Sequence, residues 1–196
     1  MEEMGCHDAE WDNPCVGLPI ETPRLRIRPF TPVDAAHIHE AYSDSEVGTP
    51  LEPGGATNGL EDTIDVVDHV IAFHKEHGTG PWAVEELASS RVIGDCGLFP
   101  ADRSDAGLDG DLELAFRLRR ASWGLGYATE AAGAVIAYGF EDLGASRIVA
   151  DVDAENAASS RVLEKLGFVV VGTGAERGSS LLYYALDAPL TGGSGA

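Results

Sequence analysis

The sequence predicts an α/β domain in which helices cover both faces of a mixed sheet of about seven strands. The expected elements run in the order strand, two helices, three strands, helix, strand, helix and two strands, and this order favours a mixed sheet. The segment DLELAFRLR at 111–119 places Leu112, Leu114, Phe116 and Leu118 on one face and Glu113, Ala115, Arg117 and Arg119 on the other, as a half-buried strand does. A glycine-rich turn, WGLGYA at 123–128, then joins this strand to an alanine-rich helix.

The first half of the domain is expected to begin with a strand and two helices. The segment PRLRIRPF at 23–30 alternates as a strand. The segment 31–44 opens with Thr31 as N-cap, Pro32 at the first helical position and Asp34 in the first turn, so it reads as a helix. After a loop rich in Gly and Pro, apolar residues at helical spacing predict a second helix over 60–78, ended by Gly78.

The second half alternates strands and helices. A hairpin is expected from strands at 81–87 and 91–99 around the short turn ASS. A helix should follow the glycine turn from about Tyr127 to Leu143, with Gly144 as its C-cap. The remaining elements are a strand at 147–153, a helix that starts near Asn156, and strands at 168–173 and 180–186.

Length and composition indicate one soluble domain. The 196 residues suit one hydrophobic core, and we expect an arm over 1–20, a domain over 21–188 and a flexible tail over 189–196. No apolar run approaches the roughly 20 residues that span a bilayer, and the acidic start of the chain lacks the apolar core of a signal peptide. Cys6, Cys15 and Cys96 are too scattered for a disulfide framework or a zinc site, so we expect reduced thiols and a cytoplasmic location.

The charge is strongly negative, at -20 from 33 acidic and 13 basic residues. Such a chain should repel nucleic acid and anionic membranes and attract cationic ligands, although most of these carboxylates are expected only to solvate the surface. Only two lysines are present, so an anionic ligand would need arginines or backbone N–H groups.

The glycine turn is a candidate anion site, because the N–H groups and the dipole of a helix N-terminus both favour negative charge. A Walker loop would need Lys and Ser/Thr where Tyr127 and Ala128 stand. A dinucleotide-binding turn would need Gly where Thr129 stands, and an acidic residue where Arg147 begins a strand. Two interpretations of the glycine turn stay open: a loop that binds the pyrophosphate of coenzyme A, and a tight turn that binds no ligand.

Two segments carry a resemblance to a known family. ELAFRLRRASWGLGYATEA at 113–131 and RIVADVDAENAASSRVLEKLGF at 147–168 resemble the GNAT superfamily of N-acetyltransferases, and within it the ribosomal-protein N-terminal acetyltransferase (RimJ/RimL-like) branch. The likeness runs from about Glu21 to Leu186. It implies the GNAT fold, in which two splayed parallel strands, here 112–119 and 147–153, form the acetyl-CoA cleft.

The resemblance also implies the cofactor contacts. The family pattern Gln/Arg-x-x-Gly-x-Gly/Ala falls on Trp123, Gly126 and Ala128, so Trp123 departs from it, and Arg119 and Arg120 would supply positive charge instead. Backbone groups of the strand would pair with the pantetheine arm, and Asn156 would bond it or cap a helix. The full set of expected acetyl-CoA contacts is Phe116, Leu118, Arg119, Arg120, Trp123, Gly124, Leu125, Gly126, Tyr127, Ala128, Asn156 and Ser159.

Acetyl transfer to an amine needs a base for the amine and an acid for the departing thiolate. The Tyr that many family members use as the acid is Leu163 here, and Asn156-x-x-Ser159 instead matches the branch in which Ser is the proposed donor. Ser159 could equally be a plain first-turn residue. Glu113 is the candidate base, with Asp95 and Glu85 as rivals, and an exposed strand carboxylate is the simpler alternative for each.

Other reactive side chains are expected to play no catalytic part. His74 and His77 are three residues apart but lack a third ligand in a metal-binding pattern, so no metal is expected. Cys96 has no His pattern to support a nucleophile and is expected in the core.

The sequence thus predicts an acetyl-CoA-dependent N-acetyltransferase, monomeric or homodimeric. Its acceptor would be a protein N-terminal amine or a cationic small molecule of polyamine or aminoglycoside type. The acceptor site would be built from 47–59, 100–110 and 175–180, which carry no motif. A non-catalytic coenzyme A-binding domain and, more distantly, a nucleotide-binding oxidoreductase are the alternatives.

Overall fold

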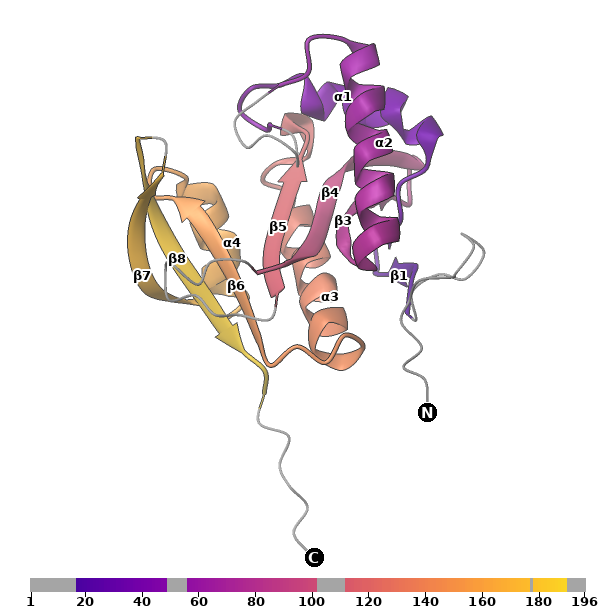
Figure 1. Cartoon of the computed structure of the whole chain (residues 1–196). Helices are drawn as coiled ribbons and strands as arrows, with labels where there is room; N and C mark the ends of the chain where they lie inside the picture. The colour runs from indigo at the N-terminus through magenta and orange to yellow at the C-terminus, as the bar shows by residue number, and fades with distance from the viewer. Residues whose placement is uncertain (1–16, 49–55, 102–111, 177, 190–196) are drawn as a thin grey trace, which may run out of the picture. The chain divides into compact units, whose positions relative to one another are not determined.

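A computed structural model describes residues 17–48, 56–101, 112–176 and 178–189 (Figure 1). The chain divides into two compact units. The first consists of the chain up to Phe99 together with Leu114–Val135, and the second of Pro100–Glu113 and Ile136–Ala196.

Eight strands are hydrogen-bonded in the order β1-β2-β3-β4-β5-β6-β8-β7. The pairs β1–β2, β2–β3, β3–β4, β6–β8 and β7–β8 are antiparallel, while β5 and β6 are parallel, so the predicted mixed sheet is confirmed. The sequence predicted seven strands. The additional one is the short β1, which pairs with β2 through Ile20 and Glu21. The strands are β1 (Ile20–Glu21), β2 (Leu25–Arg28), β3 (Gly80–Glu86), β4 (Arg91–Pro100), β5 (Leu112–Leu118), β6 (Arg147–Asp153), β7 (Val169–Glu176) and β8 (Ser179–Asp187).

Four α-helices accompany the strands: α1 (Ala35–Tyr42), α2 (Leu60–His77), α3 (Tyr127–Glu141) and α4 (Ala157–Lys165). Two details differ from expectation. The predicted helix at 31–44 begins as a 3-10 turn over Pro32–Asp34, and α3 ends two residues before Leu143. Gly78 and Gly144 follow α2 and α3 with φ of +68° each, the left-handed conformation that suits glycine at a helix C-terminus.

The first unit buries its strands on both faces. Trp82, Ala83 and Val84 are successive residues of β3 and all are fully buried, which requires cover on each side of the strand. In Figure 1, α2 lies in front of β3, and α3 lies behind β4 and β5. The core beneath α1 and α2 contains Phe30, Ala35, Ile38, Ala41, Tyr42, Val67, Val70, Ala83 and Val92.

A buried ion pair fixes the chain where β2 leads into α1. Arg28 donates from Nη1 and Nη2 to the two carboxylate oxygens of Asp34 at 2.8 and 2.9 Å, and from Nε to Glu85 on β3 at 2.8 Å. Asp34 also accepts from the backbone N–H of Thr31 at 2.7 Å and is 2% exposed. Burial alone would raise the pKa of Asp34, but the hydrogen bonds from Arg28 and Thr31 outweigh it and hold the pKa below its ordinary value of 3.8.

Close approach of β5 to β4 depends on a missing side chain. A Cβ at Gly94 on β4 would overlap the backbone oxygen of Arg117 and the side chain of Leu118, both on β5. Arg119, just after β5, donates its backbone N–H to the Ile93 carbonyl at 2.8 Å. Gly94 therefore sets the position of the end of β5, from which the glycine turn departs.

The second unit is an antiparallel β6-β8-β7 sheet with α4. Leu163 of α4 and Phe168 beyond it are buried, and Val149 of β6 packs against Ala185 of β8. The first residues of β7, Val169–Val171, are exposed. The parallel pairing of β5 with β6 joins Leu112 to Ile148 and Glu113 to Val149, within this unit. No helix in the described part of the chain is long and apolar enough to cross a membrane.

We predict that Gly94→Ala destabilises the protein by at least about 2 kcal/mol, because the added methyl group overlaps backbone rather than a movable side chain. Urea unfolding measures the change. Gly59→Ala is the control, since a Cβ at Gly59 meets nothing within 4 Å, and it should cost under about 1 kcal/mol. Equal effects of the two substitutions would contradict the close β4–β5 approach.

We predict that Asp34→Asn destabilises the protein by about 2–4 kcal/mol near pH 7, because Arg28 loses its buried counter-charge. A lowered pKa means that Asp34 contributes this stability above about pH 4 and loses it as the pH falls through the folded-state value. The gap between wild type and variant in urea unfolding should therefore shrink below about pH 4. Asp44→Asn, which removes a carboxylate that is half-buried rather than fully buried, should cost much less. A cost independent of pH would refute the role of the charge.

Candidate active site

The turn between β5 and α3 adopts a conformation that favours glycine. After β5, a 3-10 turn over Arg120–Ser122 leads to Gly124 and Gly126, which have φ of +74° and +82°. A Cβ at Gly124 would meet nothing within 4 Å, and one at Gly126 would meet only the Arg24 Nη2 atom at 3.5 Å. Backbone conformation rather than lack of space therefore selects glycine in the protein without ligand.

The start of α3 presents backbone N–H groups without helical acceptors. The first bond of the helix runs from the N–H of Glu130 to the carbonyl of Gly126 at 3.1 Å. The N–H groups of Gly126 through Thr129 precede it, and within the described residues no acceptor is found for them. Such a row of N–H groups at the positive end of a helix dipole is suited to a phosphate.

Trp123 supports the turn from one side. Its indole Nε1–H donates to the carbonyl of Leu118, the last residue of β5, at 2.6 Å. The side chain is 45% exposed, and the Arg120 guanidinium lies 5.7 Å from its ring centroid. Trp123, which stands where the family pattern has Gln or Arg, thus uses its indole N–H to bind the end of β5.

The two arginines expected to attract phosphate are both paired with carboxylates. Arg119 Nη1 lies 3.2 Å from Glu40, on α1. Arg120 makes two bonds of 3.0 Å to the carboxylate of Asp44 and a further contact of 3.0 Å to Glu46. The Arg120 side chain is 52% exposed, so a phosphate would compete with these carboxylates for it in water.

Two residues that the sequence analysis did not single out lie against the turn. Arg24, just before β2, donates to the carbonyl of Leu125 at 2.9 Å and lies 4.5 Å above the ring of Tyr127. The same guanidinium bonds Glu130 in the first turn of α3 at 2.6 Å. The Tyr127 hydroxyl in turn donates to Glu86 at 2.6 Å. The sequence holds no local signal for these contacts, because the partners are far apart in the chain.

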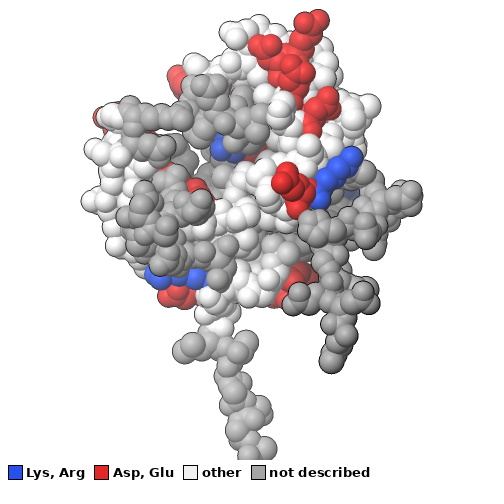
Figure 2. All heavy atoms as spheres, in the orientation of Figure 1, with Lys and Arg blue, Asp and Glu red and all other residues white. Residues whose placement is uncertain are grey.

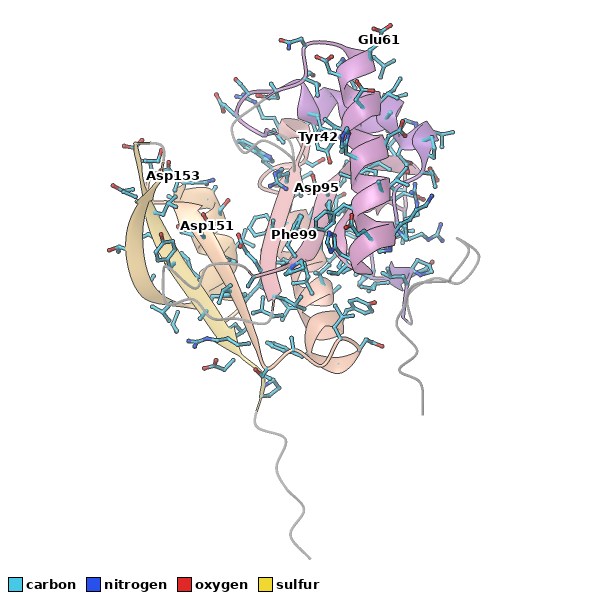
Figure 3. The ribbon with its side chains drawn as sticks, in the orientation of Figure 1. Tyr42, Glu61, Asp95, Phe99, Asp151 and Asp153 are labelled. Carbon is cyan, nitrogen blue, oxygen red and sulfur yellow. The ribbon has the colours of Figure 1, made fainter. Side chains whose placement is uncertain are left out.

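The rival bases Asp95 and Glu85 are both paired with arginines. Asp95 on β4 is fully buried and accepts from the Tyr42 hydroxyl and from Arg117 Nη1, each at 3.1 Å (Figure 3). Burial raises the pKa of Asp95 even against these two partners. Glu85 lies beside Arg28 and Arg26, at 2.8 and 3.6 Å.

Cys96 lies in the core, as predicted. The side chain is fully buried on β4, and burial raises the pKa of its thiol well above the ordinary value. Cys6 and Cys15 lie outside the described residues, as do most of the predicted acceptor segments at 47–59 and 100–110. Among the residues that the structure describes, no three His, Cys, Asp or Glu side chains gather as metal ligands would.

The second unit holds the residues with predicted acid and base roles. Asn156 is the N-cap of α4, and its side-chain oxygen accepts from the backbone N–H of Ser159 at 3.0 Å. Ser159 is half-buried, whereas Leu163, at the position of the missing Tyr, is fully buried in the core. Glu113 is half-buried at the start of β5, where it pairs with Val149 of β6. Phe116 and Leu118 lie farther along β5, half-buried and buried respectively, in the first unit.

Comparison with known proteins identifies the family. The family model for the "Acetyltransferase (GNAT) domain" matches residues 24–169, more than half of the chain. The chain is 31% identical over 149 residues to the "uncharacterized N-acetyltransferase YoaA" of Bacillus subtilis, covering 76% of this chain and 81% of that protein. It is 30% identical over 147 residues to the "uncharacterized N-acetyltransferase p20" of Bacillus licheniformis, covering 75% and 80%.

Solved structures agree. A GNAT-family acetyltransferase from Bacillus anthracis superimposes with a TM-score of 0.72 at 28% identity, over 86% of this chain and 97% of that one. A ribosomal-protein-S5-alanine acetyltransferase from Vibrio fischeri superimposes with a TM-score of 0.68 over 85% and 94%, but its 19% identity shows the fold alone. From the strand order, the glycine turn at the start of α3 and these matches together, the chain belongs to the GNAT family of acetyltransferases.

Proposed function

We propose that this acetyltransferase uses acetyl-CoA and binds its pyrophosphate at the turn 123–128. The observation that supports this proposal is the row of N–H groups from Gly126 to Thr129 at the start of α3, next to glycines at positive φ. The exposed position of this turn leaves room for a ligand, and the residues at the turn fit a diphosphate through backbone rather than through free cations. Leu125 and Ala128 would contribute backbone contacts, and β5 near Phe116 and Leu118 would pair with the pantetheine arm.

In this proposal, Arg119 and Arg120 contact the pyrophosphate only if it displaces the carboxylates with which they are paired. Both guanidinium groups are held by carboxylates of the α1 region, which reduces the positive field they offer to a phosphate. The Asp44 and Glu46 partners of Arg120 are surface carboxylates, so binding of a diphosphate can draw the guanidinium from them at modest cost. The backbone N–H groups would then provide the permanent contacts and Arg120 an added one.

The proposed reaction is direct attack of a bound primary amine on the thioester. The amine nitrogen forms a bond to the carbonyl carbon, the carbon–sulfur bond breaks, the nitrogen loses one proton and the thiolate gains one. Glu113 is proposed to take the proton from the amine, directly or through water. Ser159 is proposed to hydrogen-bond the departing sulfur, with Asn156 fixing its place at the start of α4.

A protein N-terminal amine is the acceptor that we propose first. The pattern Asn156-x-x-Ser159 resembles the ribosomal-protein acetyltransferase branch. The negative charge favours a basic acceptor, and Figure 2 shows acidic side chains gathered over the region of α2, whose first turn carries Glu61 and Asp62. A polycationic small molecule meets the same electrostatic requirement and is the second candidate.

Calorimetric titration with acetyl-CoA tests the proposal, with NADH as the control ligand. Micromolar binding of acetyl-CoA alone supports it, and an assay with basic N-terminal peptides and with polyamines then ranks the acceptors. Absence of acetyl-CoA binding to the folded protein would overturn it.

We predict that Gly126→Val weakens acetyl-CoA binding more than tenfold, because a branched side chain would stand among the N–H groups that receive the pyrophosphate. Gly144→Val is the matched control for backbone strain. Gly144 also has a positive φ, +68°, and open space around its Cβ position, but it follows the other end of α3. Both variants should lose stability, and only Gly126→Val should change the dissociation constant. Equal dissociation constants would remove the turn from the site.

We predict that Ser159→Ala lowers kcat about tenfold or more while the dissociation constant of acetyl-CoA stays within about twofold, because the hydroxyl acts on the departing sulfur. Ser160→Ala, at the next position of α4 and also half-buried, is the control and should leave kcat unchanged. Steady-state kinetics and titration measure the two quantities. If Ser159→Ala and Ser160→Ala behave alike, Ser159 is only a helix residue.

A further inference from the structure

A carboxylate in the first turn of α3 ties the start of β2 to the candidate site. One oxygen of Glu130 accepts from the Thr22 hydroxyl at 2.7 Å and from the backbone N–H of Arg24 at 2.9 Å. The other oxygen lies 2.6 Å from both Nε and Nη2 of Arg24. Three hydrogen bonds and one further ion-pair contact therefore converge on one side chain that is 16% exposed, which is more than an isolated surface ion pair provides.

The remaining nitrogen of Arg24 reaches the glycine turn itself. Nη1 donates to the carbonyl of Leu125 at 2.9 Å. In a trans peptide the carbonyl and the following N–H point in opposite directions. By holding the Leu125 carbonyl, Arg24 turns the N–H of Gly126 away from itself and fixes its direction. The guanidinium also lies over the ring of Tyr127, the first residue of α3, so it contacts the turn on both sides of Gly126.

The opposite charges of Arg24 and Glu130 also affect how an anion would bind at the turn. Burial alone would raise the pKa of Glu130, but hydrogen bonds from Thr22 and Arg24 outweigh it and lower the pKa, so the side chain is an anion near neutral pH. A helix N-terminus favours such an anion, yet the same anion would repel a diphosphate at that terminus. Arg24 balances the charge of Glu130 at the point where an anionic ligand would otherwise meet it.

We propose that Arg24 and Glu130 are positioning residues for acetyl-CoA binding: Arg24 fixes the turn at Leu125 and neutralises Glu130, and Glu130 anchors Arg24 to α3. This inference rests on the proposed binding of acetyl-CoA at the turn. A positioning role differs from a merely structural link in its effect on acetyl-CoA affinity. An exposed ion pair with no role in binding would change stability slightly and leave the affinity for acetyl-CoA unchanged.

The test is a double-substitution cycle read by calorimetry with acetyl-CoA. Arg24→Ala should weaken binding about tenfold, because the turn loses its clamp and Glu130 keeps an unbalanced charge. Glu130→Gln, which keeps the shape and removes the charge, should stay within about threefold of wild type. The double variant should bind at least about threefold more tightly than Arg24→Ala alone, since the repelling charge is gone.

Arg26→Ala is the matched control, because Arg26 lies two residues farther along the chain, has similar exposure and pairs with Glu21 at 2.8 Å, away from the turn. It should leave affinity unchanged. The proposal is overturned if Arg24→Ala binds acetyl-CoA as Arg26→Ala does, or if the double variant binds no better than Arg24→Ala.

A second measurement separates this inference from the proposed function. In the protein without ligand, Arg24→Ala should lower the backbone order of the Gly124 and Gly126 amides in ¹⁵N relaxation, and Arg26→Ala should not. If wild type fails to bind acetyl-CoA, the proposed function fails, and the relaxation data still decide whether Arg24 holds the turn. Unchanged order in Arg24→Ala would overturn the positioning role.

Discussion

The turn between β5 and α3 has to meet two conflicting requirements. Under the proposed function, its backbone N–H groups must stay without partners so that they can bind a diphosphate, yet an unbonded segment would have no fixed conformation. The structure fixes the turn through its carbonyls instead. Trp123 holds the carbonyl of Leu118, and Arg24 holds the carbonyl of Leu125. The positive φ of Gly124 and Gly126 completes the turn without using an N–H group.

The anchoring of β5 serves the same end. Because Gly94 lets β5 approach β4 closely, the strand delivers its last residue to a defined place. Most of the described arginines also form ion pairs with carboxylates of the chain itself, as Arg28, Arg117 and Arg120 do. In a protein with a net charge of -20, this pairing leaves helix dipole and backbone N–H groups as the main local attraction for an anion.

Local sequence signals predicted the elements well and the partners poorly. The alternation at 112–118, the hairpin turn ASS and the glycines before α3 depend on neighbours in sequence, and the structure contains each of these elements. The two-residue β1 was missed, since it is too short for a periodic pattern. The extra length expected for α3 reflects the usual difficulty in placing helix ends, because the backbone N–H groups of Asp142 and Leu143 still bond the carbonyl of Tyr138 beyond the last helical residue, Glu141.

The partners of the site residues could not be predicted, because their contacts join segments that are distant in sequence. Glu130 reaches Arg24 across 106 positions, and Asp95 meets Tyr42 across 53, so no window of sequence contains both members of either pair. The same holds for Arg119 and Arg120, which looked available for a ligand because their carboxylate partners lie in α1 and just after it. Sequence spacing identified the turn as a candidate, whereas only the fold shows what holds it.

Amide hydrogen exchange of the wild-type protein, with and without saturating acetyl-CoA, tests the central claim most directly. The N–H groups from Gly126 to Thr129 lack acceptors in the described protein, so they should exchange quickly without ligand and become protected with it. The account predicts that protection is largest in the peptide covering 123–130. Protection that leaves this peptide unchanged while another segment is protected would contradict the account.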